Sequence, residues 1–212
     1  MLTASALLPP SHKWRRYEQT ALKIRNFAGV ALDDRLDPFE LAGCAGLQVV
    51  SLDQVKGLSE ETRKQLLSVD PGSWSGGASK SLPDGSRLII LNPQHARTRQ
   101  CATLMEEVCH VFLGHQPSRI QASSSNAQRV ESLHGRRHAF RDYNDTDEEE
   151  AYAVGAAALV PYYGLRRALE EGITVAAIAR RYGVSMKLVE YRLKVSHLWA
   201  EYQQHTGARQ GQ

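Results

Sequence analysis

The residues best suited to chemistry lie between positions 106 and 110, where the sequence reads EEVCH. Glu106 and His110 are four residues apart, so they share one face of a helix if this stretch is helical. Glutamate and histidine both bind divalent metal ions, and a second carboxylate, Glu107, stands beside the first of these ligands. This arrangement suits metal-assisted hydrolysis, in which a general base removes a proton from metal-activated water.

The string is a variant of a known pattern. Zinc peptidases commonly carry HExxH, with two histidine ligands at this spacing and a glutamate after the first. In this chain Glu106 stands at the position of the first histidine. A carboxylate has about the reach of an imidazole and binds zinc at ~2.0 to 2.2 Å, so ligation is geometrically feasible. The alternative for Glu106 and Glu107 is a solvated helix face, with His110 as an ordinary half-buried histidine.

Two separated stretches resemble the ImmA/IrrE-type metallopeptidases, the anti-repressor proteases. Residues 103–115, TLMEEVCHVFLGH, are similar to that family's active-site helix, which typically reads HExxH followed by LLGH. Residues 148–161 begin EEEA and end Leu-Val-Pro, similar to the family's second signature, an E-x-x-A helix with the same type of ending. Residues 82–93 resemble the hairpin that precedes the active-site helix. The likeness spans about residues 14–197.

The resemblance implies a role for each residue of the site. It makes Glu107 the general base, and His110 and Glu148 metal ligands, with Glu106 as the third ligand in place of histidine. The implied cofactor is Zn²⁺ or another divalent ion such as Mn²⁺. Glu150 stays an alternative to Glu148, which is preferred on the family's register. Two carboxylates and one neutral imidazole cancel the charge of a divalent ion, so we expect a weaker activation of water or a harder metal than zinc.

The resemblance also implies a function. The chain is expected to be a cytoplasmic metallo-endopeptidase that cleaves a helix-turn-helix transcriptional repressor, and thereby regulates mobile-element or stress genes. The alternative is a catalytically weak or inactive peptidase-fold regulator that acts by protein or DNA binding, because Glu106 departs from the family's pattern.

Two helices are needed to position these residues. Helical patterning predicts the first at about 97–114 and the second at about 146–160, where Thr146 and Glu149 have capping-box spacing. On the first helix, the side chains expected to face the core are Leu104, Val108, Val111 and Phe112. Small residues on the second helix, Ala151, Gly155 and Ala158, would let the two approach closely. Residues 116–145 are expected to form a long exposed loop, with His134 and His138 as surface histidines.

Two neighbours of the proposed ligands are assigned other roles. His115 lies about 140° around the helix from His110, so it is expected to cap or pack rather than bind the same ion. Cys109 points away from the ion and is expected to be a small core residue.

Helix, strand and turn patterns in the rest of residues 1–161 predict a small sheet beside a helical core. Helices are expected at 12–28, from Pro38, and at 59–67, and a short strand at 47–52. Residues 74–79 and 87–91 flank an Asp84-Gly85 turn and predict a hairpin. The expected class is α+β, a zincin-like metallopeptidase domain (1–161) with a small antiparallel sheet, followed by a C-terminal helical segment (162–212).

The C-terminal segment fits a helix-turn-helix template over residues 175–193. Gly183 would occupy the turn and Ser185 would cap the second helix. The exposed side of that helix is expected to carry Met186, Lys187, Glu190, Tyr191 and Lys194. This face is only mildly basic, so DNA binding is less favoured than a partner-docking surface or a helical cap on the catalytic domain.

Composition excludes several other classes. The chain of 212 residues has 26 Lys+Arg against 23 Asp+Glu, which argues against coating nucleic acid through bulk charge. Three cysteines without CxxC spacing argue against a disulfide framework and a thiolate zinc site. The longest weakly polar run, residues 151–165, is too short to span a bilayer, and residues 1–10 do not resemble a secretory signal.

Overall fold

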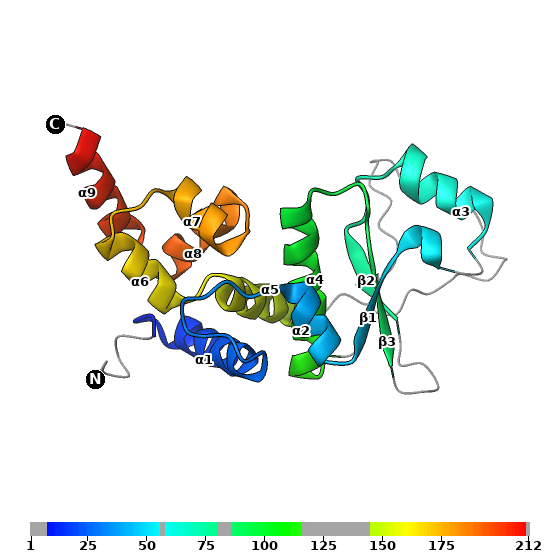
Figure 1. Cartoon of the computed structure of the whole chain (residues 1–212), viewed down its shortest axis with the longest axis horizontal. Helices are drawn as coiled ribbons and strands as arrows, with labels where there is room; N and C mark the ends of the chain where they lie inside the picture. The colour runs from blue at the N-terminus through cyan, green and yellow to red at the C-terminus, as the bar shows by residue number, and fades with distance from the viewer. Residues whose placement is uncertain (1–7, 56–57, 80–85, 116–144, 211–212) are drawn as a thin grey trace.

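The structure is a computed structural model that describes residues 8–55, 58–79, 86–115 and 145–210. In chain order its elements are α1 (His12–Phe27), α2 (Pro38–Cys44), β1 (Leu47–Ser51), a 3-10 turn (Leu52–Gln54), α3 (Glu60–Lys64), a π-helical turn (Gln65–Val69), β2 (Gly76–Ala78), β3 (Arg87–Leu91), α4 (Arg97–Leu113), α5 (Asp145–Leu159), α6 (Tyr162–Glu170), α7 (Val175–Tyr182), α8 (Met186–Val195) and α9 (Trp199–Gln210) (Figure 1). The two helices predicted to carry the site are found as α4 and α5, within one residue at each end. The predicted Asp84-Gly85 turn lies outside the described residues, as do residues 116–144 of the predicted loop with His134 and His138.

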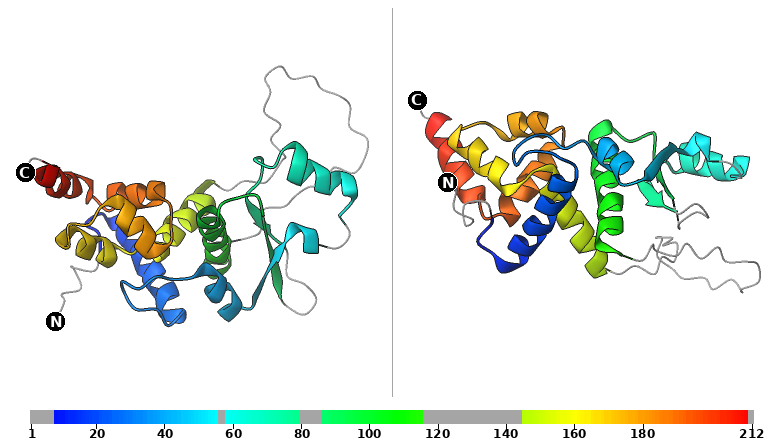
Figure 2. Two further views of the ribbon diagram at one scale, coloured as in Figure 1. Left: turned by 45° about the horizontal axis from the view of Figure 1, so that its top comes forward. Right: turned by 60° about the horizontal axis from the view of Figure 1, so that its bottom comes forward.

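Helix α4 lies between the sheet on one side and α1 and α5 on the other (Figures 1 and 2). Its buried side chains recur every three or four residues, as an amphipathic helix requires; they are Cys101, Leu104, Met105, Val108 and Cys109. Leu104, Val108 and Cys109 are thus confirmed in the core. Phe112 is predicted there too, but it is 38% exposed: it lies in the last turn of α4, where its ring makes a T-shaped contact with Phe27, which is itself exposed.

The sheet has the strand order β1-β3-β2 within the described residues. Strands β2 and β3 are antiparallel, as the predicted hairpin requires. The prediction of a wholly antiparallel sheet is wrong for β1, which is parallel to β3. The chain crosses from β1 through α3 to the opposite edge before it returns as β3, and such a crossover places the first and last strands in the same direction. The α+β class is confirmed.

Asn92 fixes α4 relative to the sheet. It is fully buried, and its side-chain amide donates to the carbonyls of Pro71 (2.6 Å) and Trp74 (2.9 Å). Its own backbone carbonyl accepts from the side chain of Gln100 in α4 (3.1 Å). One buried polar residue therefore ties the approach to β2, the end of β3 and the first turns of α4 together.

Helices α7 and α8 are joined by the short turn that the sequence predicts. Gly183 has φ +67°, which suits glycine at the turn, and the Ser185 hydroxyl accepts from the backbone N–H of Leu188. Val184 and Val189 are buried between the helices.

The second of these helices, α8, packs against α1 and α5. Arg192 is buried and donates to the carbonyl of Val160 (2.9 Å) and to Glu18 of α1 (2.6 Å). Tyr191 was expected on the exposed face, but its ring lies between Trp14 and Tyr152, with centroids 6.3 and 5.1 Å away. Part of the face that would read DNA therefore packs against α1 and α5.

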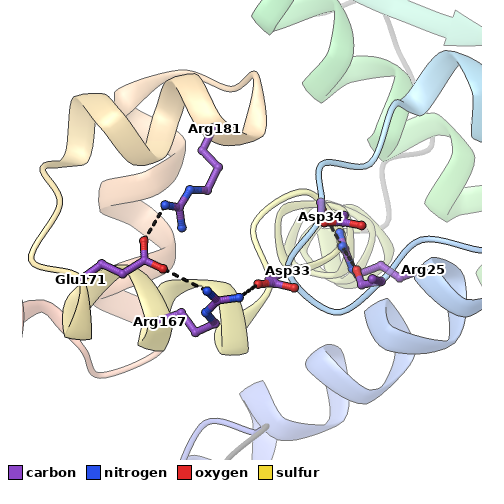
Figure 3. A network of polar contacts seen from close by, with 7 residues as sticks. Arg25, Asp33, Asp34, Arg167, Glu171 and Arg181 are labelled. Carbon is purple, nitrogen blue, oxygen red and sulfur yellow. Dashed lines mark hydrogen bonds and ion pairs between the residues drawn. The ribbon is translucent and has the colours of Figure 1, made fainter.

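Polar contacts also link the C-terminal helices to the connection between α1 and α2 (Figure 3). Glu171 accepts from Arg181 (2.5 Å) and from Arg167 (3.2 Å), and Arg167 also pairs with Asp33. Arg25 donates to the backbone carbonyl of Asp34 (2.6 Å). The ion pairs are exposed and contribute little individually. The hydrophobic core continues from α1 through α4 and α5 into α6, α7 and α8.

A bilayer crossing would need a longer and more apolar helix than any in the described ranges 8–55, 58–79, 86–115 and 145–210.

Candidate metal centre

The candidate site forms where α4 and α5 pack closely. An ideal Cβ placed on Gly155 of α5 would lie 3.3 Å from Cγ of Met105 and 3.5 Å from Sγ of Cys109, both on α4. Ala151 and Ala158 of α5 are fully buried in the same region. The prediction that small residues permit this approach is confirmed, and it brings the first turn of α5 beside the middle of α4.

The structure brings the three predicted ligands together. Glu106, His110 and Glu148 each offer one ligand atom, and these atoms all lie within 4.8 Å of one another. Nε2 of His110 is 3.5 Å from Oε2 of Glu148. Two ligands of a tetrahedral ion with bonds of ~2.1 Å lie ~3.4 Å apart, so this pair already has the spacing that one bound ion requires.

The acidic residues around Glu148 have different partners. Glu149 pairs with Lys13 of α1 (2.5 Å), and Glu150 pairs with Arg16 (3.6 Å). Glu150 also faces His115, with 3.6 Å between Oε2 and Nε2. The geometry therefore favours Glu148 over Glu150 as the carboxylate from α5.

The electrostatics of the group suit a cation. Burial, together with the charges of Glu148 and Glu107, raises the pKa of Glu106 from 4.5 to about 7. Burial lowers the pKa of His110, and the nearby Glu148 carboxylate opposes that shift. Two carboxylates that repel each other beside a neutral imidazole are stabilised by a divalent ion, which offsets their charge. The donor set of two oxygens and one nitrogen thus fits a divalent metal.

Glu107 lies next to the group rather than in it. Its side chain is half-buried, and its charge is one of the causes that raise the pKa of Glu106. This places the predicted general base beside the predicted ligands. Its catalytic role stays a prediction.

Sequence reasoning missed one neighbour of the site, Tyr152. It follows Glu148 by four residues on α5, so the two side chains share a face, and that spacing could have identified it. Its side chain is 39% exposed, and burial together with the charge of Glu106 raises the pKa of its phenol.

The raised pKa of Glu106 predicts how Glu106→Gln changes the stability of the metal-free protein. The pKa of Glu106 is raised on folding, so the folded state holds its proton more tightly, and the stability of the metal-free protein falls as pH rises from 4.5 to about 7. Removal of this carboxylate should therefore stabilise chelated protein at pH 8 by about 1 to 3 kcal/mol, and by much less at pH 4.5.

Urea unfolding in the presence of a chelator at both pH values measures this difference. Glu170→Gln, at an exposed glutamate on α6, is the matched control and should change little at either pH. A Glu106→Gln protein with wild-type stability at pH 8 would contradict the raised pKa.

Comparison with known proteins identifies the family. The family model for the IrrE N-terminal-like domain of peptidase family M78 matches residues 67–194, more than half of the chain. The chain belongs to this family. The matched residues include all those of the candidate metal centre.

Comparison with solved structures finds a distant similarity. A Mycobacterium tuberculosis transcriptional regulator is similar with a TM-score of 0.48 and 14% identity, over 84% of this chain and 46% of that one. This chain therefore spans less than half the length of that regulator. Comparison with curated proteins gives no match.

Proposed function

We propose that the protein is a metal-dependent endopeptidase in which Glu106, His110 and Glu148 hold a divalent cation and Glu107 is the general base. The observation that carries this proposal is the convergence of these three ligands from α4 and α5 within 4.8 Å. The match to a peptidase family over the same residues supports it. We further propose that the protein acts in the cytoplasm.

The residues of the site divide the work of hydrolysis. A bound Zn²⁺ or Mn²⁺ supplies a Lewis acid that polarises a carbonyl and lowers the pKa of water. Glu107 takes a proton from the attacking water and delivers it to the leaving nitrogen. The peptide bond then breaks to give a neutral amine instead of an unstable amide anion. Tyr152, four residues after Glu148 on α5, is the proposed hydrogen-bond donor to a substrate oxygen.

The edge of the sheet offers a place for an extended substrate. Among the described strands β2 lies at an edge of the sheet, and it lies against α4, since an ideal Cβ on Gly76 would meet Cγ2 of Thr103 at 2.7 Å. Thr103 is one helical turn before Glu107. A peptide added to β2 by backbone hydrogen bonds would therefore run close to the candidate centre.

The proposed substrate is a helix-turn-helix transcriptional repressor. The resemblance of residues 103–115 and 148–161 to the anti-repressor proteases supports this class. Direct DNA binding through α8 is less favoured, because Tyr191 is half-buried against Trp14 and Tyr152.

Elemental analysis of freshly purified protein, followed by a cleavage assay, tests the proposal. About one divalent ion per chain and cleavage that a chelator abolishes are the expected results. Glu106 in place of histidine favours the alternative of a noncatalytic regulator. Metal-free protein that still binds a repressor after His110→Ala would support that alternative and overturn the peptidase.

A further inference from the structure

His115 lies directly behind the proposed ligand His110. The Nδ1 atoms of the two rings are 3.0 Å apart, and the rings meet edge to face. Gly114 has φ +72° and ends α4, and the backbone N–H of His115 donates to the carbonyl of His110 (2.9 Å). This turn returns the imidazole of His115 to the helix face that carries His110, where its side chain is only 9% exposed.

Two nitrogen atoms 3.0 Å apart share one proton, so one ring donates and the other accepts. The other nitrogen of His115, Nε2, faces two carboxylates of α5: Asp147 at 3.8 Å and Glu150 at 3.6 Å. Their negative charge favours an N–H at Nε2 of His115, which leaves Nδ1 as the acceptor. The proton between the rings then belongs to Nδ1 of His110.

This hydrogen bond determines what His110 offers at its other nitrogen. With the proton on Nδ1, Nε2 of His110 carries a lone pair, and that atom faces Glu148 at 3.5 Å. Metal-binding histidines typically donate their second N–H to a fixed acceptor, which sets the tautomer and the orientation of the ring.

We propose that His115 is a positioning residue: it accepts from Nδ1 of His110 and so holds the Nε2 lone pair of His110 toward a divalent cation. The inference rests on the proposed function, because it concerns the same metal site. Asp147 and Glu150 contribute by orienting His115. Their side chains therefore act on the centre without ligating the ion.

Substitutions at position 115 separate this role from simple packing. Asparagine carries an acceptor oxygen the same number of bonds from Cα as Nδ1 of histidine, whereas leucine and phenylalanine fill space without an acceptor. A packing role predicts that the apolar variants do better than asparagine. A positioning role predicts the opposite order.

The experiment measures Zn²⁺ and Co²⁺ affinity of the full chain by competition with a chromophoric chelator. His115→Leu and His115→Phe should bind ~10 to 100-fold more weakly than wild type and alter the visible spectrum of bound Co²⁺. His115→Asn should stay close to wild type in affinity and spectrum. His12→Leu, at an exposed histidine in the first turn of α1, is the control and should bind like wild type.

The outcomes distinguish the two levels of the proposal. Wild-type affinity in His115→Leu and His115→Phe, or an equal loss in His115→Asn, would overturn the role of His115. Absence of metal binding in the wild type would instead overturn the metal centre itself. Circular dichroism of the metal-free variants checks their fold, and the two apolar variants provide independent readings should one of them not fold.

Discussion

Glu107→Gln is expected to abolish peptide hydrolysis while leaving metal binding intact. Glutamine keeps the shape of the side chain but cannot accept the proton of the attacking water, and general-base catalysis typically contributes ~10² to 10⁴-fold to the rate. The ligand group of Glu106, His110 and Glu148 does not include Glu107, so the ion should remain bound. The turnover number, measured by mass spectrometry on a pool of unstructured peptides, should fall by at least ~10²-fold.

A matched substitution shows whether this loss is specific. Glu170→Gln removes the same charge from an exposed position on α6, far along the chain from the site, and should keep wild-type turnover. Metal content measured on both proteins separates loss of the base from loss of the ion. Stoichiometric metal with undiminished cleavage in Glu107→Gln would show that another group removes the proton.

The parts of the fold that depend on neighbouring residues were predictable from the sequence. Asp37 before Pro38 predicted the start of α2, and the Asp37 carboxylate does accept from the backbone N–H of Phe39 (2.8 Å). Gly183 and Ser185 likewise predicted the turn and the cap between α7 and α8. The residues that form these caps and turns lie within a few positions of the groups they bond, so the local sequence is sufficient to predict them.

Features that depend on distant contacts were not predictable in the same way. The direction of β1 depends on where the chain re-enters the sheet after α3, and no residue within β1 specifies that. Tyr191 has the spacing of a surface residue on α8, yet its ring packs against Trp14 and Tyr152, which come from two other helices. Hydrophobic periodicity identifies the apolar face of one helix, but it does not indicate which other helices pack against it.

The candidate metal centre combines residues that local sequence predicts with residues that depend on distant contacts. Glu106 and His110 were placed together by helical spacing, whereas Glu148 is far along the chain and required the family resemblance. Helical spacing predicts that His115 lies about 140° around the helix from His110, but α4 ends at Gly114 and the left-handed turn brings the two rings together. Helical spacing therefore fails at the residue where the helix stops. That His115 packs rather than binds the ion stays a prediction.

Glu148→Gln and Glu150→Gln are expected to separate sharply in metal affinity. Glutamine at position 148 removes a charged oxygen ligand 3.5 Å from Nε2 of His110. This loss should exceed the ~10 to 100-fold that is typical when a residue behind a ligand is changed. Zn²⁺ affinity, measured by chelator competition at pH 8, should therefore fall by more than ~100-fold in Glu148→Gln.

Glu150→Gln is the sharpest comparison, because it changes the same residue type on the same helix two positions away. Glu150 contacts His115 and Arg16 rather than the ligand group, and Asp147 still faces Nε2 of His115 when Glu150 is neutral. Its affinity loss should consequently stay below ~10-fold, the lower limit for outer residues of metal sites. Equal losses in the two variants, or a larger loss in Glu150→Gln, would contradict the assignment of Glu148 as the ligand from α5.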